Sequence, residues 1–329
     1  MNIFWALFFI PAGFAIIVKG ANWLIDGSVG LAEKFGVSGL VIGLTVVAMG
    51  TSAPEAATSI STALRGMWST AIGNIYGSNI ANLALIGGIC ALIRPIHVRV
   101  SVTWREMPIM LIAALSLWPI LSLDGALSRY EAGFLLLFFV VAMWFSIYTA
   151  RRDEKMRLQK ADVFDDEIEV KHSKQNKLAV DIMFVLLGFA ALAIGANLAT
   201  QGAGFVGRRI GLSEAVVGLT ILAIGTSLPE LVTCVIAALK GHDDLSIGNL
   251  VGSNIFNTLL VIGAAGMAKP FSMLPSRLTG VDYWIMIGVS GVFVAIAFAK
   301  KGIGRASGVI LTVGYIAYMV YVCIFTPGV

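Results

Sequence analysis

The sequence predicts an all-α polytopic membrane protein with ten transmembrane helices, arranged as two inverted five-helix repeats. Composition is the first observation behind this class: 58% of the 329 residues are hydrophobic, the mean hydropathy is +0.88, and 13% are charged, against about 25% in soluble domains. The second is an internal duplication, because residues 36–85 align without a gap to residues 211–260 and match at 25 of 50 positions. A soluble protein and a nucleic-acid partner are therefore excluded, and a lipid bilayer is the expected environment.

Hydropathy divides the chain into ten apolar segments, each close to the roughly 20 residues that span a bilayer as a helix. The expected spans are 3–24, 37–64, 69–92, 106–123, 130–150, 178–199, 212–239, 245–268, 282–299 and 304–326. The opening MNIFWALFFIP lacks the basic region and cleavage site of a signal peptide, so it is read as the first span.

The order of the spans predicts how the two repeats are related. Five spans form one repeat, and because five is odd, the second repeat enters the membrane from the opposite side. We therefore expect a first five-helix repeat over residues 1–150 and a second, inverted one over residues 178–329. The charged stretch 151–177 between them is too short to fold alone and is predicted to be a cytoplasmic linker.

Basic residues predict the orientation in the membrane. With both termini outside, 17 of the 23 lysines and arginines fall on the cytoplasmic side, as the positive-inside rule requires. The 17 comprise eight in the linker together with Lys19, Lys34, Arg94, Arg99, Arg105, Lys240, Lys300, Lys301 and Arg305. The sequence thus predicts a multi-pass protein of the cell (inner) membrane, and leaves monomer and homo-oligomer both open.

Two acidic residues stand out because they lie deep inside spans. Glu55 ends the motif GTSAPE, and Glu230 ends the equivalent GTSLPE 175 positions later. A carboxylate at this depth is costly unless its charge is compensated, and the spans offer no basic partner. A purely structural role for both is the weaker alternative, so the pair indicates cation handling within the membrane.

The residues around each glutamate predict further oxygen ligands. Pro54 should break its helix and free backbone carbonyls near Ala48 and Gly50, and the same wording recurs around Ala223 and Gly225. Thr51 lies four residues before Glu55 and therefore shares its helical face, as Thr226 does with Glu230. Carboxylate, hydroxyl and carbonyl oxygens form a set that suits calcium better than zinc or copper.

A second repeated block, GNIYGSNIAN and GNLVGSNIFN, adds polar side chains at the same offset. Ser78 and Asn82 are four residues apart, and Ser253 and Asn257 match them. Asparagine between membrane helices is also a common interhelical hydrogen-bonding residue, and hydroxyls beside a proline break often satisfy freed backbone groups. Both roles stay open for these side chains.

The paired motifs resemble the alpha-repeats of the cation/calcium exchanger superfamily, and are most similar to prokaryotic sodium/calcium exchangers. The resemblance covers the whole chain. It implies broken helices 2, 3, 7 and 8 around a central cation site that opens to each side in turn while helices 1 and 6 slide. By motif it implies that calcium binds Glu55, Glu230, Thr51 and Thr226, and that sodium uses the same glutamates with Ser52, Ser227, Ser78, Ser253 and the backbone oxygens of Ala48 and Ala223.

The function that follows is secondary antiport of calcium for sodium by alternating access, with no enzymatic activity and no cofactor. One position departs from the family pattern, because many sodium/calcium exchangers carry aspartate where this chain has Asn257. Two carboxylates neutralise one calcium ion or two monovalent ions, so exchange of calcium or another divalent cation for protons remains an alternative. A cation channel is more remote, because an inverted repeat suits alternating access better than an axial pore. An intramembrane hydrolase would need the two glutamates to have different surroundings.

Overall fold

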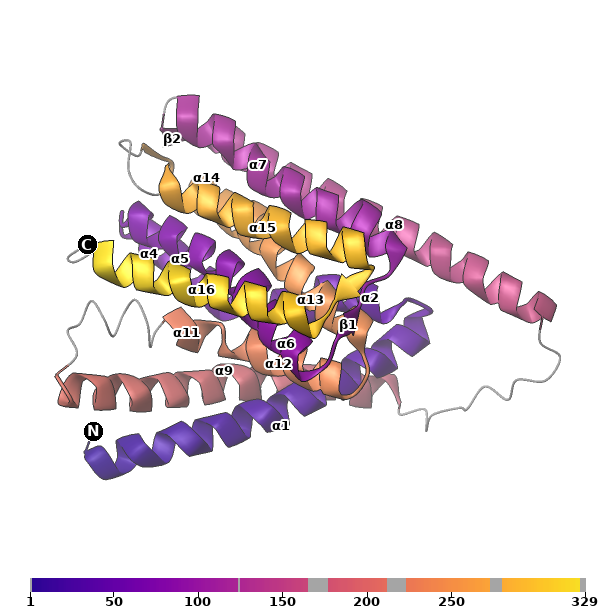
Figure 1. Cartoon of the computed structure of the whole chain (residues 1–329), viewed down its shortest axis with the longest axis horizontal. Coiled ribbons are helices and arrows are strands. Elements are labelled where there is room, and N and C mark those ends of the chain that lie inside the picture. The colour runs from indigo at the N-terminus through magenta and orange to yellow at the C-terminus, as the bar shows by residue number, and fades with distance from the viewer. Residues whose placement is uncertain (1, 124, 165–176, 212–222, 273–279, 326–329) are drawn as a thin grey trace.

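The computed structural model describes residues 2–123, 125–164, 177–211, 223–272 and 280–325. Nearly all of these residues lie in helices that run roughly along one direction of the molecule (Figure 1). Both termini lie at one end, whereas α8 ends at the opposite end (Figure 1). Each long apolar helix satisfies its backbone hydrogen bonds within itself, and this is the condition for crossing a membrane.

The first half contains five helical stretches, several of them made of consecutive segments. Its elements are α1 (Ile3–Phe35), α2 (Gly39–Ile42), the π-helix η1 (Gly43–Val47), α3 (Ala48–Thr51), α4 (Ala53–Leu64), α5 (Trp68–Ile80), the π-helix η2 (Ala81–Ile86), α6 (Gly87–Ile93), β1 (Ile96–His97), the π-helix η3 (Val102–Glu106), α7 (Met107–Leu123), β2 (Ala126–Leu127) and α8 (Arg129–Phe164).

The second half repeats this order in the residues that are described. Its elements are α9 (Leu178–Arg209), α11 (Ala223–Thr226), α12 (Leu228–Leu239), α13 (Asp243–Ile255), the π-helix η5 (Phe256–Val261), α14 (Ile262–Ala268), β3 (Phe271–Ser272), α15 (Val281–Lys300), β4 (Gly302–Ile303) and α16 (Arg305–Phe325). The π-helices η2 and η5 begin and end 175 positions apart, so the sequence repeat is also a repeat of local backbone structure.

Seven helices within the described ranges are long and apolar enough to cross a membrane, and the bent pair Gly39–Thr51 and Ala53–Leu64 makes an eighth if it counts as one span. The count of ten stays a prediction, since α7 has 17 residues and the first part of the expected span 212–239 lies outside the described residues. The protein is nonetheless a multi-pass helical membrane protein, as the composition indicates.

Two expectations about the helices differ from the structure. The fifth helix does not end at 150, because α8 continues to Phe164 and so takes up the first part of the expected linker; residues 165–176 lie outside the described residues. The third and eighth helices are not interrupted either. Each runs continuously through a π-helical segment, over Trp68–Ile93 and Asp243–Ala268, because one wider turn accommodates an extra residue without ending the helix.

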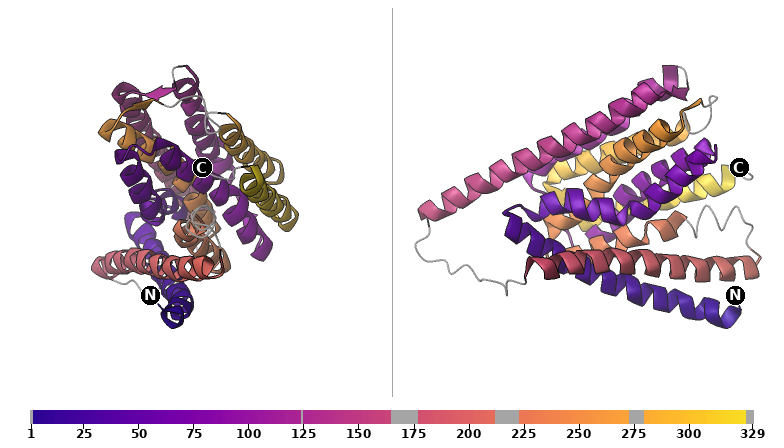
Figure 2. Two further views of the ribbon diagram at one scale, coloured as in Figure 1. Left: turned by 90° about the vertical axis from the view of Figure 1, so that its left-hand side faces the viewer. Right: turned by 180° about the vertical axis from the view of Figure 1, so that it is seen from behind.

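The long helices α1 and α9 pack against each other along their length and lie at one edge of the molecule (Figure 2). Small residues make this contact close. A Cβ built at Gly13 would lie 2.6 Å from the Gly195 carbonyl oxygen, and one at Gly20 would lie 3.0 Å from the Gly188 carbonyl oxygen. Such small-residue contacts let two membrane helices approach at backbone distance, so α1 and α9 form a paired unit beside the other helices.

Short connections join the two halves at both ends of the molecule. β1 pairs with β4 and β2 pairs with β3, both antiparallel, and each ribbon takes one strand from each half. Helix ends are joined in the same crossed manner. Arg94 Nη1 donates to the Ala238 carbonyl at 2.9 Å, and Lys269 Nζ, 175 positions later, donates to the Leu64 carbonyl at 3.1 Å. Each cation thereby donates to a carbonyl in the last turn of α12 or α4 and complements the helix dipole.

Candidate cation site

Two helix breaks place the glutamates at the centre of the bundle. Ser52 (φ −82°, ψ 3°) separates α3 from α4, and Ser227 (φ −91°, ψ 4°) separates α11 from α12. The bend at the first break is 49°. The break that was expected at each proline is found two residues before it, because proline is tolerated in the first turn of the following helix. Glu55 and Glu230 consequently lie in the first turn of α4 and α12, near free backbone N–H groups.

The two breaks face each other across the halves. Ser52 Oγ donates to Glu230 Oε1 at 2.9 Å, and Ser227 Oγ donates to Glu55 Oε1 at 3.2 Å. Each half therefore supplies a hydroxyl to the carboxylate of the other half. Both glutamates are buried, with 1% of their surface exposed. The structure thus brings four of the residues singled out in the sequence to one point.

Buried oxygen atoms without partners lie on α4, on α12 and on the helices that pack against them. The second carboxylate oxygens of Glu55 and Glu230, the amide oxygens of Asn82 and Asn257, and the hydroxyl of Ser253 accept or donate no hydrogen bond among the described residues. Buried polar atoms are nearly always paired, so each such atom needs an explanation. All five are oxygen donors, the ligand type that calcium and sodium prefer.

Asn257 makes an interhelical contact with its amide nitrogen, while its amide oxygen has no hydrogen-bond partner among the described residues. Asn257 Nδ2 donates to Asn79 Oδ1 at 3.3 Å, and Asn79 Nδ2 donates to Thr258 Oγ1 at 2.9 Å. Interhelical bonding and a free amide oxygen therefore coexist at Asn257. Asn82 and Asn257 lie in the π-helices η2 and η5, a backbone form that is frequent at functional sites.

Thr51 is positioned by a residue that the sequence reasoning did not single out. Its Oγ1 donates to Asn249 Oδ1 at 3.1 Å and lies 3.4 Å from the Ala48 carbonyl oxygen, while Asn249 Nδ2 points to Cys234 Sγ at 3.2 Å. Asn249 belongs to the repeated GN pair of the second motif. Its counterpart Asn74 makes the corresponding contact within the first half, to Ser59 Oγ at 2.9 Å. The repeated asparagine was a signal available in the sequence.

The remaining expected ligands are placed less fully. Ser78 is buried on α5, and Thr226 ends α11 and is partly exposed. Ala223 begins α11, and its side chain lies outside what is described. Among the described residues no group of three or more His, Cys, Asp or Glu side chains could hold a metal ion. A divalent ion at the centre would therefore bind two carboxylates together with neutral oxygens.

A cavity of about 610 Å³ lies between α9 and the two breaks. Its lining includes Pro54, Thr58, Phe189, Asn197 and Thr226. α1, the partner of α9 at the same edge of the molecule, packs along α12, whereas the cavity separates part of α9 from α4. The two halves thus share sequence motifs but differ in how closely the long helices cover them. The cavity reaches the residues next to both breaks from the side of α9.

Comparison with known proteins places this geometry in a family. The family model described as sodium/calcium exchanger protein matches residues 5–148 and 180–324. The inner membrane protein YrbG of Escherichia coli is 33% identical over 96% of this chain and 96% of its own length, and the sodium/calcium exchanger MaX1 of Methanosarcina acetivorans is 32% identical over 94% and 95%. The putative antiporter CaxA of Alkalimonas amylolytica is 33% identical over 95% and 97%. A solved structure of the sodium-calcium exchanger NCX_Mj, soaked with zero Na⁺ and Ca²⁺, superimposes with a TM-score of 0.80 at 25% identity, covering 98% of this chain and 100% of that chain.

Proposed function

We propose, on the premise that the chain belongs to the sodium/calcium exchanger family, that it is a secondary antiporter which exchanges calcium for sodium across the cell's inner membrane. The observation that carries this proposal is the set of unpaired buried oxygens that both halves contribute, together with the crossed Ser–Glu pairs. A mobile cation is the partner that such oxygens need, because a buried carboxylate without a counter-charge is strongly unfavourable.

The proposed architecture is two five-helix repeats of opposite orientation, joined by the linker 151–177. Two features support it: the ribbons that pair strands of opposite halves and the sequence-equivalent caps by Arg94 and Lys269. The positive-inside bias supports both termini outside and the linker in the cytoplasm. In this orientation the cavity beside α9 lies on the outer side of the break residues.

The proposed calcium ligands are Glu55 and Glu230 together with the hydroxyls of Thr51 and Thr226. Sodium ions would use the same glutamates, so the two cargoes compete for overlapping sites. The further proposed sodium ligands are Ser52, Ser227, Ser78, Ser253, the amide oxygens of Asn82 and Asn257, and the backbone oxygens of Ala48 and Ala223. The hydrogen bonds of Ser52 and Ser227 to the glutamates place both hydroxyls beside the carboxylates that an ion would bind.

Exchange rather than leak follows from the cost of moving the empty site. Closing two unpaired carboxylates into a dry cavity is unfavourable, so only the occupied, neutralised site passes between the two open states. The paired helices α1 and α9 are the proposed moving unit, because their mutual contact is close while α9 borders the cavity. In this movement α1 would separate from α12 when α9 closes on α4.

Protons are the second candidate for the coupling ion, and a specific residue favours them. Asn257 contributes a neutral amide, so the carboxylates of the proposed site are those of Glu55 and Glu230. Two glutamates can each take one proton when calcium leaves, whereas three sodium ions would leave about one uncompensated charge in a low-dielectric site.

The test is calcium uptake into proteoliposomes under an imposed sodium gradient and, separately, an imposed pH gradient. We expect the sodium gradient to drive uptake, and expect Glu55→Gln and Glu230→Gln to abolish it under either gradient. Glu131→Gln is the matched control, because Glu131 caps the start of α8 through Ser128 outside the central site. Normal uptake in both central variants would refute the site, and uptake driven only by the pH gradient would replace sodium with protons.

A further inference from the structure

A third buried glutamate lies outside the central site, at the end of η3 where α7 begins. The Glu106 side chain is 0% exposed, and neither of its carboxylate oxygens takes part in a hydrogen bond within the described part of the chain. Glu106 lies outside the repeated motifs, so the duplication that relates Glu55 to Glu230 does not explain its burial. A buried acid of this kind needs a compensating partner.

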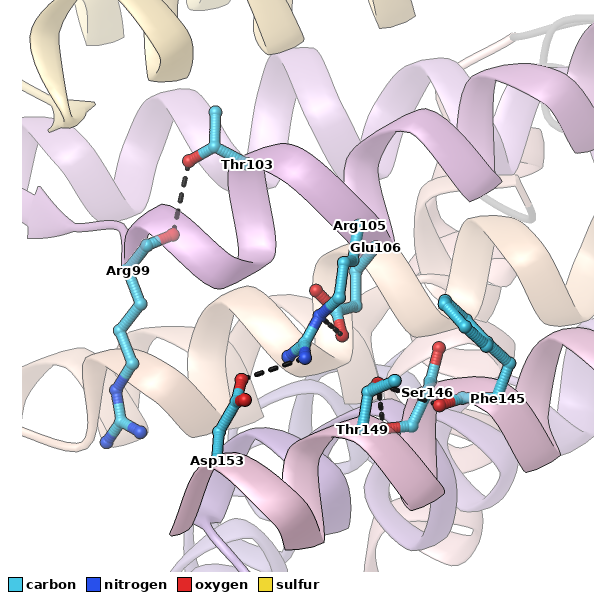
Figure 3. Close-up of polar contacts among 8 residues, drawn as sticks. All are labelled: Arg99, Thr103, Arg105, Glu106, Phe145, Ser146, Thr149 and Asp153. Carbon is cyan, nitrogen blue, oxygen red and sulfur yellow. Dashed lines mark hydrogen bonds and ion pairs between the residues drawn. The ribbon is translucent and has the colours of Figure 1, made fainter. Parts of the chain in front are cut away.

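Arg105 supplies only part of that compensation. Its Nε lies 3.5 Å from Glu106 Oε1, and its Nη1 donates to Asp153 Oδ2 on α8 at 2.8 Å. Successive side chains of a regular α-helix do not face each other, but here Arg105 and Glu106 lie side by side on the π-helical segment (Figure 3). One guanidinium is therefore shared by two carboxylates, and the three groups together carry one excess negative charge.

α8 also presents an unpaired hydroxyl on this side. Ser146 is 2% exposed, and its Oγ has no hydrogen-bond partner among the described residues. Figure 3 shows this hydroxyl on the side of α8 that faces Arg105 and Glu106. The neighbouring Thr149 is satisfied locally, because its hydroxyl donates to the Phe145 carbonyl at 2.7 Å. The cluster thus contains an excess charge, two carboxylate oxygens without a hydrogen bond and an unpaired hydroxyl.

A proton fits this cluster better than a metal ion does. A metal ion would lie against the positive guanidinium of Arg105, and the few oxygens present fall short of the six to eight that calcium takes. A proton needs one carboxylate oxygen and removes the excess charge. We propose that Glu106 is a proton-binding site, separate from the central glutamates, at the end of the molecule where α8 leads into the linker.

Binding of the proton changes how the start of α7 is held against α8. The charged groups that act on Glu106 in the described structure are Arg105 of its own segment and Asp153 of α8. With Glu106 neutral, the guanidinium pairs with Asp153 alone, and the new carboxyl O–H becomes a donor on the side where Ser146 offers an acceptor. α7 packs against α13, which carries the site residue Ser253, so this change reaches the transport helices. The inference goes beyond the proposed exchange, and its first readout does not depend on transport.

The test is pH-dependent infrared difference spectroscopy of the whole protein held at saturating calcium. We expect a protonated-carboxyl C=O band that appears on acidification, is lost in Glu106→Gln and is kept in Glu131→Gln. Asp153→Asn should keep the band and move its midpoint to lower pH by about 0.5 unit or more, because Arg105 then serves Glu106 alone. Glutamine has nearly the size of protonated glutamic acid, and retained calcium binding would show that Glu106→Gln is folded.

Transport gives the second readout. In proteoliposomes with pH varied on the linker side, Glu106→Gln should keep exchange near the wild-type rate at low pH and lose at least half of the pH dependence. A band that persists in Glu106→Gln, or an unchanged midpoint in Asp153→Asn, would overturn the proposal. An identical pH profile of exchange in wild type and Glu106→Gln would overturn the link to transport helices.

Discussion

Gly252 offers a sharp test of whether close helix contact sets the geometry of the central site. It lies on α13, where a Cβ would meet the Leu44 carbonyl oxygen at 2.7 Å, the Leu44 Cα at 2.8 Å and the Ala48 Cβ at 2.9 Å. Two of these atoms belong to the backbone of η1, so no side-chain rotation relieves the contact. Gly252→Ala must therefore separate α13 from η1 and α3, which carry Ala48 and Thr51.

The size of the effect follows from the cost of overpacking, about 1–3 kcal/mol for one added methyl group in a tight contact. If that strain appears as lost ion binding, calcium affinity falls by about 5- to 150-fold, since 1.4 kcal/mol corresponds to a factor of ten. The matched control is Gly314→Ala on α16, where an added Cβ meets nothing within 4 Å of the described atoms.

The assay is equilibrium calcium binding to the purified protein, with thermal stability measured on the same samples. We expect Gly252→Ala to bind calcium at least fivefold more weakly and Gly314→Ala to bind it as the wild type does. Wild-type affinity in Gly252→Ala, with unchanged stability, would refute the view that backbone contact between α13 and η1 fixes the ligand positions.

Two further predictions concern charge. Asn257→Asp adds a third carboxylate beside the unpaired oxygens and should tighten calcium binding about tenfold or more, measured by equilibrium binding at fixed pH; an unchanged affinity would place residue 257 outside the ion site. The second prediction concerns the ion pair of Lys240 Nζ with Asp26 Oδ1, at 2.6 Å, which joins α1 to the end of α12. Because both side chains are partly exposed, the pair should change the equilibrium between the open and closed positions of α1 by about fivefold at most. Asp26→Asn should therefore lower the labelling of a cysteine placed at Thr58 in the cavity by up to about fivefold. The charge-reversed double variant, Asp26→Lys with Lys240→Asp, should restore the labelling. If the double variant does not restore it, the pair has no such role.

Much of the central site could be predicted from the sequence because chemistry and repetition coincide there. A carboxylate within an apolar run is conspicuous, and its recurrence 175 positions later identifies Glu55 and Glu230 as a pair. Proline in each motif predicts a break nearby, since it cannot continue the preceding helix. The crossed bonds of Ser52 and Ser227 to the opposite glutamates were beyond this reasoning, because they depend on how the halves are packed.

Features that depend on packing and on local backbone geometry were harder to predict. Asn249 holds the Thr51 hydroxyl, but in the sequence it is one polar residue among several in a glycine-rich block. The π-helical segments have no composition that distinguishes them from α-helix, so η2 and η5 were not expected. Glu106 begins an expected span, where an acidic residue is compatible with the helix dipole, and only its complete burial sets it apart.

The two halves differ in the residues that join the long helices to their neighbours. The central motifs are nearly identical, yet the residues that join α1 to α12 are not matched in the other half: the positions equivalent to Asp26 and Lys240 are Gln201 and Arg65. Gln201 is neutral and donates to Asn197 at 2.9 Å, within α9. An ion pair can therefore hold α1 closed on one side, while no equivalent pair can hold α9 closed on the other. In the proposed exchange both open states use the same repeated site, and the unequal contacts at its two sides would set which state the empty protein prefers.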